Sequence, residues 1–273
     1  MKANTIKNPN RSRTVLAAVG VVLAVVVLVA IAVAYDKLHG IWLEQCVITD
    51  VASQVSITDG KMVRADVVAY EFGLKNGANL ALIDFDAKRR DILKKIPNIR
   101  NITVSRHLPN RVEIAVEERV PVVRLGIKGQ KRDSGRVADS DGVVFISSSG
   151  TQMLPLIWES TAPGTAKGQR LSGAALGALV LLETCRDQFR ELNAIEADVS
   201  KSDHIVIVLG TDYSRANVDW PGRDNPSEAT KADLVERLTN LRHSYTSRVD
   251  DSIREWDATQ PGVCTGNTKR KLL

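Results

Sequence analysis

The sequence predicts an α+β protein with a transmembrane helix at its N-terminus, a small domain after it, and a larger, mostly antiparallel β domain with flanking helices. From Val15 to Ala34 no side chain is charged or strongly polar, and as a helix these 20 residues reach about 30 Å, the thickness of a bilayer's hydrocarbon core. Downstream, apolar residues first recur every three or four positions and then alternate, which is typical of helices followed by half-buried strands. This order indicates layers of helices on a sheet.

The charges around the apolar segment predict its orientation. Residues 1–14 carry four basic side chains and no acid, whereas Asp36 and Lys37 cancel on the other side. By the positive-inside rule, the N-terminus of a single-pass protein with this pattern lies in the cytoplasm and the bulk of the chain lies outside it. We therefore expect a cytoplasmic tail over 1–14 and a transmembrane helix over 15–35.

A juxtamembrane linker is expected over 36–44. Tyr35 and Trp42 stand at either end of it, where amphipathic rings lie at or near lipid headgroups. The alternative for the apolar segment is a secretory signal peptide, because Ala32-Val33-Ala34 fits a small-residue cleavage site. The apolar run is longer than the usual core of a signal peptide, which favours a retained anchor.

Charge and cysteine content exclude some functions. The formal net charge is +5, and the four tail cations leave about +1 for the rest of the chain, so the sequence gives no reason to expect nucleic-acid binding. Cys46, Cys185 and Cys264 lie far apart, with no paired spacing that would indicate a metal site. At most one disulfide can form among them.

Residues 45–118 read as strand, helix, helix, strand, strand. The first strand is either 46–51 or 54–57, and a helix follows from near Asp59-Gly60 to Gly73. A second helix has its apolar stripe at Phe85, Ile92, Leu93 and Ile96, with Asp84 or Asp86 as its cap and Pro97 as its end. The period then changes to two over 102–105 and 111–117, with Leu108-Pro109-Asn110 as the turn, which predicts a hairpin.

The region after Pro121 predicts a second layered domain. Its expected elements are a loop over 126–135, a hairpin over 137–146 with Asp141-Gly142 at its turn, a helix over 171–189, strands over 195–199, 204–209 and 215–220, a helix over 234–249, and a closing strand over 253–258 before a tail.

No constellation of catalytic residues stands out. His39, His107, His204 and His243 are isolated in the sequence, and no zinc-protease, serine-nucleophile or phosphate-loop motif occurs. We expect no catalytic residue, no metal, no cofactor and no small-molecule substrate. The expected activity is protein–protein binding.

Several short motifs together carry a resemblance to the bacterial FtsQ/DivIB cell-division proteins and their POTRA domain. The matching residues are Gly77-Ala78-Asn79-Leu80, Ile83-Asp84, Ile96-Pro97-Asn98-Ile99, Val104–Asn110, Val116–Pro121, Asp141–Phe145 and Leu154-Pro155-Leu156. The resemblance implies a POTRA domain over 45–118, a C-terminal β domain over 119–262 and a tail over 263–273. It also implies a non-enzymatic scaffold of the cytoplasmic membrane that links septation proteins outside the cytoplasm.

The resemblance also implies where partners bind. In that family, a C-terminal sheet edge binds small bitopic proteins, FtsB and FtsL, by strand addition. The family's closing strand usually reads isoleucine-aspartate-leucine-arginine-tyrosine, and this chain matches it only at Asp257. The expected partner-binding residues are Ile253, Arg254, Trp256, Asp257, Ala258 and Thr259.

Two other functions stay open. Another POTRA-bearing protein of envelope assembly or secretion would usually carry several POTRA repeats ahead of a β-barrel, and this sequence has one repeat behind an N-terminal anchor. A membrane-anchored cell-wall enzyme would need a catalytic constellation that the sequence does not display.

Overall fold

The structure is a computed structural model, and it describes residues 9–58, 60–130, 135–147, 150–159 and 164–268. The chain divides into two compact units. One contains Met1–Thr58, Ala65–Arg89 and Thr103–Ala115, and the other contains Asp59–Arg64, Arg90–Ile102 and Val116–Leu273. A three-stranded sheet draws its strands from both units, and a nine-stranded sheet lies in the second unit.

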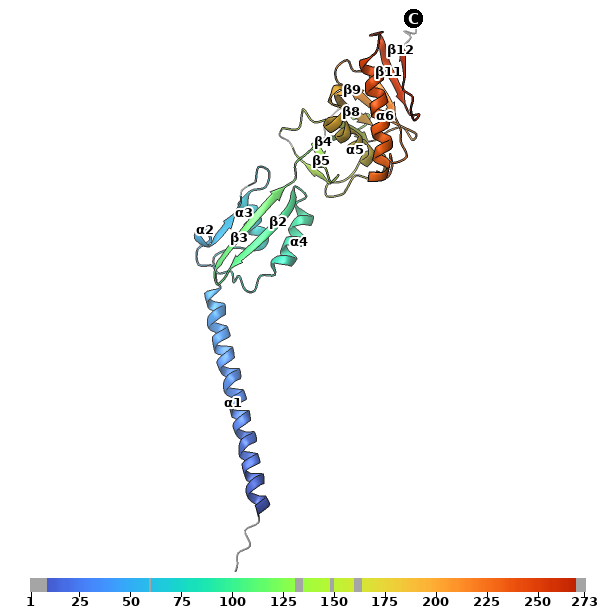
Figure 1. Cartoon of the computed structure of the whole chain (residues 1–273). Coiled ribbons are helices and arrows are strands. Elements are labelled where there is room, and N and C mark those ends of the chain that lie inside the picture. Colours follow the sequence, from blue (N-terminus) through green and yellow to red (C-terminus); the bar gives the residue numbers. More distant parts are fainter. Residues whose placement is uncertain (1–8, 59, 131–134, 148–149, 160–163, 269–273) are drawn as a thin grey trace, which may run out of the picture. The chain divides into compact units, whose positions relative to one another are not determined.

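Helix α1 runs without a break from Pro9 to Gln45 (Figure 1). From Val19 onward it is long and apolar enough to cross a membrane. The expected linker over 36–44 is therefore helical, because no residue there stops the helix once the apolar segment has started it. The helix ends where the Leu43 carbonyl accepts a hydrogen bond from Asn79 Nδ2 at 2.8 Å.

The predicted order strand, helix, helix, strand, strand is confirmed in the region after α1. Its three-stranded sheet has the order β1-β3-β2, with β1 parallel to β3 and Val55 opposite Val112. Asp84 is the cap of the second helix, since its Oδ1 accepts from the backbone N–H of Ala87 at 2.9 Å. The elements are α2 (Val51–Gln54), β1 (Val55–Ile57), α3 (Ala65–Phe72), α4 (Phe85–Lys95), β2 (Ile99–His107) and β3 (Arg111–Glu118).

Two details of this region differ from expectation. The sequence left two ranges open for the first strand, 46–51 and 54–57. The strand β1 lies in the second range, whereas the last residue of the first range, Val51, begins the short helix α2. The helix expected near Asp59-Gly60 begins later, at Ala65; Asp59 itself lies outside the described residues. The cause is Glu118, whose carboxylate accepts hydrogen bonds from three successive backbone N–H groups. These belong to Lys61, Met62 and Val63, at 2.9, 2.8 and 2.7 Å, and they hold the segment in a non-helical turn.

The second domain is built on a nine-stranded sheet with the order β12-β11-β10-β9-β8-β7-β4-β5-β6. Most pairs of neighbouring strands are antiparallel, while β4–β7, β7–β8 and β10–β11 are parallel. Its elements are β4 (Val123–Ile127), β5 (Arg136–Ala138), β6 (Val144–Ile146), β7 (Leu156–Glu159), α5 (Gly173–Gln188), the 3-10 turn η1 (Arg190–Leu192), β8 (Ala194–Asp198), β9 (Ile205–Leu209), β10 (Arg215–Val218), α6 (Glu228–Thr246), β11 (Ile253–Ala258) and β12 (Thr265–Thr268).

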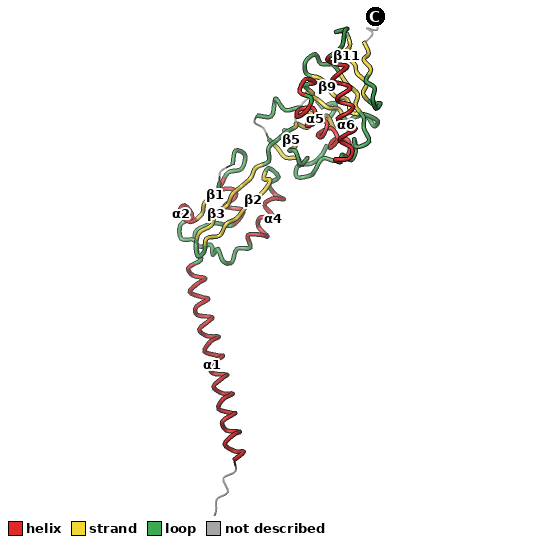
Figure 2. Tube along the Cα trace, in the orientation of Figure 1, coloured by secondary structure: helices red, strands yellow, loops and turns green. Residues whose placement is uncertain are grey.

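Helices α5 and α6 cover one face of this sheet (Figure 2). The hydrophobic core lies between them and the sheet, with Leu179 and Leu238 from the helices against Ile157 and Ile207 from the strands. Alternate residues of the same strands point to the other face, which no described helix covers. The predicted helix over 171–189 and the predicted strands after residue 190 are confirmed within a few residues. The last helix is also present, but α6 begins at Glu228, before the predicted 234, and ends at Thr246.

Three strands of this sheet were missed from the sequence. Strand β4 includes Gly126, which we had expected in a loop; part of that expected loop, 131–134, lies outside the described residues. Strand β7 begins at Leu156, which is the last residue of the Leu154-Pro155-Leu156 motif. Strand β12 occupies 265–268, inside the expected C-terminal tail.

Candidate partner-binding edge

The predicted partner strand, β11, is not at the edge of the sheet. It is parallel to β10 on one side, with Ala216 opposite Trp256, and antiparallel to β12 on the other, with Gly266 opposite Trp256. Both of its backbone edges are thus paired, and the expected free edge at Ile253–Thr259 is wrong. The outermost described strand at this end is β12.

Strand β12 offers its outer backbone groups to solvent. All four of its residues are exposed, and no described strand pairs with its far side. An edge of this kind can accept a strand from another chain through main-chain hydrogen bonds. The opposite end of the sheet is β6, which is three residues long and exposes Ile146.

A missing side chain at Gly266 lets β12 lie close to β11. A Cβ at this position would lie 2.8 Å from Ile253 Cγ2 and 2.9 Å from Trp256 Cζ3. The Trp256 ring is itself buried and meets the Tyr245 ring of α6 edge to face, with centroids 5.9 Å apart. The edge strand therefore rests on an aromatic pair that joins β11 to α6.

Two polar contacts fix the end of β11. The buried Arg237 of α6 donates hydrogen bonds to the carbonyl oxygens of Ala258, at 3.4 Å, and of Thr259. The Asp257 carboxylate accepts from the backbone N–H and the hydroxyl of Thr259 at 3.0 and 2.7 Å. Of the predicted partner-binding residues, Asp257 is exposed, while Trp256 and Ala258 are buried and support the sheet.

A charged cluster around Asp212 fixes the other end of β11. Arg248 Nη2 lies 3.0 Å and Arg254 Nη1 3.6 Å from Asp212 Oδ2, and the Tyr245 hydroxyl donates to Oδ1 at 3.1 Å. Partial burial raises the pKa of the Asp212 carboxyl, but hydrogen bonds from Ser214 and Tyr245 and the charge of Arg248 outweigh burial and lower this pKa below its usual value. The carboxylate is thus charged at neutral pH and links α6, β11 and the turn before β10.

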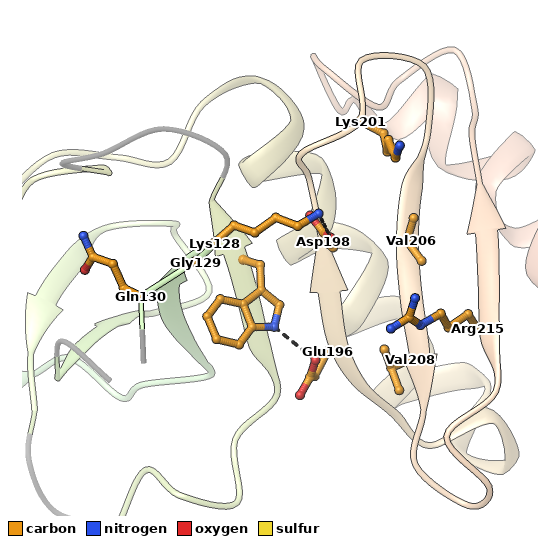
Figure 3. A pocket seen from close by; sticks show the side chains of 10 residues that line it. Lys128, Gly129, Gln130, Glu196, Asp198, Lys201, Val206, Val208 and Arg215 are labelled. Carbon is orange, nitrogen blue, oxygen red and sulfur yellow. Dashed lines mark hydrogen bonds and ion pairs between the residues drawn. The ribbon is translucent and has the colours of Figure 1, made fainter. Parts of the chain in front are cut away.

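The uncovered face of the sheet holds a shallow depression of about 360 Å³ (Figure 3). Trp158 of β7 lies over Gly126, where a Cβ would be 2.8 Å from the indole ring, and its Nε1 donates to Glu196 at 3.0 Å. Lys128 pairs with Asp198 at 2.6 Å, so the acids of the depression already have partners. Val206, Val208, Lys201 and Arg215 complete the floor and rim. Such a mixed surface can bind a partner, but it brings together no nucleophile and base.

The isolated histidines remain apart in the structure. His107 lies 3.4 Å from Glu113 and His204 lies 2.9 Å from Asp203. Within the described part of the chain, no group of three or more histidine, cysteine, aspartate or glutamate side chains could hold a metal ion. All three cysteines are free, and burial raises the pKa of the Cys185 thiol to about 12, which keeps it protonated and unreactive.

Sequence comparison bears directly on residues 45–118. Residues 52–119 match the family model described as POTRA domain, FtsQ-type. A search among proteins of curated function finds no match to this chain. The matched range spans the three-stranded sheet with its helices and ends beside Glu118, which agrees with the resemblance drawn from the sequence motifs. The chain therefore carries an FtsQ-type POTRA domain over residues 52–119.

Proposed function

We propose that this chain is a non-enzymatic scaffold of the bacterial cell-division machinery. In this proposal α1 anchors it once in the cytoplasmic membrane with the N-terminus in the cytoplasm, and both domains lie outside the cytoplasm. It links early and late septation proteins there. The FtsQ-type POTRA domain supports the division role, and the long apolar helix α1 supports the anchor.

The observation that carries the partner-binding proposal is the exposed edge of β12. A strand from a small bitopic partner resembling FtsB or FtsL would pair with Thr265–Thr268 and extend the sheet. Strand β11 then supports β12 from the inner side of the sheet. Ile253 and Trp256 of β11 pack closely against β12 because Gly266 has no side chain. The predicted residues at 253–259 thus support the binding edge, and the exposed Asp257 can reach a partner beside it.

Site-specific photocrosslinking in the native bacterium tests this edge. A photoreactive amino acid at Thr265 or Asn267 should capture a small single-pass division protein. The matched control is Ile146, an exposed residue of the strand at the other end of the sheet. Equal capture from Ile146, or capture only from surfaces away from β12, would refute the β12 edge.

The division role has a separate test. Depletion of the chain should give filaments or failed constriction, and normal septation after full loss would refute the proposal. Turnover of peptidoglycan by the purified protein would instead support the cell-wall enzyme. A periplasm-active reporter fused after Leu273 should be active if the N-terminus lies in the cytoplasm.

A further inference from the structure

One end of the first unit carries two exposed leucines. Leu82 lies between α3 and α4 and is 73% accessible, and Leu108 lies in the turn between β2 and β3 and is 53% accessible. A single exposed leucine is common on a protein surface and needs no explanation. Two of them at one end of a domain form a contact surface if the fold brings them together and if something lies opposite them.

The turn of Leu82 is bonded to the end of α1. Asn79 Nδ2 donates to the Leu43 carbonyl at 2.8 Å. Val47 and Asn79 form an antiparallel bridge, so the chain over 77–80 runs back toward the helix from which residue 47 leads away. The backbone N–H of Leu82 then donates to the Asn79 carbonyl at 3.1 Å, which closes the turn beside the end of α1.

The turn of Leu108 lies at the same end of the domain. Strand β1 receives the chain from α1 through α2 and pairs in parallel with β3, so β1 and β3 begin at the same end of the sheet. The turn of Leu108 directly precedes β3 and belongs to that end. A contact joins the two turns: the guanidinium carbon of Arg106 lies 5.6 Å from the centroid of the Phe85 ring. Phe85 follows Leu82 by three residues, so the two leucine turns are neighbours.

The residues around Leu108 are basic. The hairpin turn over 105–111 carries two arginines and no acid, and both Arg106 and Arg111 are exposed. In the other turn, the Asp84 carboxylate is used by the helix cap, since its Oδ1 accepts a backbone N–H of α4 at 2.9 Å. Exposed apolar side chains beside arginines fit an anionic membrane surface, because the apolar groups enter the headgroup layer while the guanidinium groups bind phosphate.

The bilayer that α1 would cross lies opposite this end of the domain. Trp42 directly precedes Leu43, and because helix side chains lean toward the N-terminus, its ring lies back along the helix, 6.2 Å from the ring of His39. If the headgroup layer ends between His39 and Trp42, then at 1.5 Å per residue Leu43, and with it Asn79, lies about 2–6 Å beyond that layer. A leucine side chain spans much of this gap, and a helix tilt of about 20° brings one side of the domain closer still.

We propose that the turns over 79–84 and 105–111 form a membrane-contact face of the POTRA domain, which places Leu82 and Leu108 in the headgroup layer of a bilayer that contains anionic phospholipid and sets the two arginines on its phosphates. This inference rests on the proposed membrane anchor and is independent of the binding edge at β12. The chain then holds the membrane at two places, the span of α1 and this face, and the second contact fixes how the domain stands on the bilayer.

Photocrosslinking of the full chain in reconstituted vesicles tests this face. The photoreactive amino acid p-benzoylphenylalanine is placed at Leu82 or Leu108, and at Ala115 as the control, an exposed residue of β3 about 13 Å along the strand from Arg111. The vesicles contain phosphatidylcholine with or without phosphatidylglycerol, and lipid adducts are identified by mass spectrometry. We expect lipid adducts from Leu82 and Leu108 severalfold above those from Ala115, with a higher yield from Leu108 when phosphatidylglycerol is present.

A charge variant adds a readout that folding alone does not change. With the probe at Leu108, Arg111→Glu should lower the lipid adduct by more than about fivefold in the anionic vesicles, the factor that one basic residue contributes near such a surface, and Arg111→Lys should keep it. Equal lipid adducts from Ala115, adducts only with a second copy of the chain, or yields that ignore phosphatidylglycerol would each overturn the proposal. Alkaline extraction of the same vesicles separates the two failures: an inserted chain without lipid adducts contradicts this face alone, whereas a released chain contradicts the anchor as well.

Discussion

The segment at 61–63 and the strand β12 are both short and both fastened to a neighbouring strand, but by different atoms. A side chain holds the first: the Glu118 carboxylate accepts three backbone N–H groups within 2.9 Å. Backbone pairing with β11 holds the second, and Gly266 contributes by having no side chain. The carboxylate uses up the donors of its segment, whereas strand pairing uses only one edge of β12.

The two contacts therefore differ in whether backbone hydrogen-bonding groups remain available to another chain. The three backbone N–H groups of the turn at 61–63 are all bonded to Glu118, so they are not available to pair with another strand. Strand β12 keeps its outer edge available for pairing. Substitution of Glu118 should therefore lower the local stability of residues 61–63, whereas substitution of Gly266 should chiefly remove partner binding.

Gly266→Val gives the largest expected effect. The added side chain begins at a Cβ 2.8 Å from Ile253 and 2.9 Å from Trp256, so β12 must move away from β11. We expect partner capture from Asn267 to fall more than tenfold, measured by photocrosslinking at equal protein levels. Thr265→Val is the control, because it places the same valine side chain in the same strand at a position that already holds a β-branched residue and so introduces no clash. Unchanged capture in Gly266→Val would mean that binding does not use β12.

Glu118→Ala should have the next largest effect. It leaves three backbone N–H groups without their carboxylate, and the loss should be about 3 kcal/mol of local stability. By hydrogen-exchange mass spectrometry, residues 61–63 should then exchange about 100-fold faster, since each 1.4 kcal/mol is about tenfold. Glu117→Ala is the matched control, because Glu117 is half exposed and lies 3.7 Å from Arg100. Similar exchange in the two variants would show that the carboxylate does not fix this turn.

Asp212→Asn should destabilise the sheet end behind β12 by about 2 kcal/mol, because the variant keeps the shape of the side chain and loses its charge between Arg248 and Arg254. The measurement is urea unfolding followed by fluorescence of the four tryptophans. Asp203→Asn, at an exposed carboxyl beside His204, should leave the free energy of unfolding nearly unchanged.

The same carboxyl predicts a pH dependence. Because the folded protein lowers the pKa of Asp212, the charged form contributes stability above its ordinary pKa of about 4, and this contribution is lost as pH falls through the lower folded value. The free energy of unfolding of the unmodified chain should therefore fall between about pH 5 and pH 3, and Asp212→Asn should fall less. Parallel pH curves would contradict the lowered pKa.

The POTRA region was predictable because the side chains that determine its helices and strands form patterns in the local sequence. The stripe at Phe85 and Ile92 and the alternation in β2 and β3 follow from burial on one side, and the cap is Asp84, one of the two caps that the sequence offered. The start of α3 was not predictable, because the group that delays it, Glu118, is more than fifty positions away. No pattern in the neighbouring sequence predicts a contact with a residue so far along the chain.

The candidate binding edge was largely invisible in the sequence. Thr265–Thr268 is exposed throughout, so it has no alternation of apolar residues, and backbone pairing asks little of its side chains. Gly126 indicated a loop, yet it lies in a strand because Trp158 occupies the space of its side chain. The placement of the edge at Ile253–Thr259 failed for the same reason, since nothing in β11 reveals that another strand lies outside it.

Asn79 provides the smallest effect and extends the comparison to the end of α1, because its side chain bonds two backbone groups there. Its Nδ2 donates to the Leu43 carbonyl at the end of α1 at 2.8 Å, and its Oδ1 accepts from the backbone N–H of Ala81 at 2.9 Å. Asn79→Ala removes both bonds and should cost about 1 kcal/mol, so residues 44–48 should exchange about fivefold faster. Asn79→Asp keeps the acceptor and loses the donor, which isolates the bond to the helix. If Asn79→Asp exchanges like the unmodified chain, backbone pairing alone holds α1 to the POTRA domain, as it holds β12 to β11.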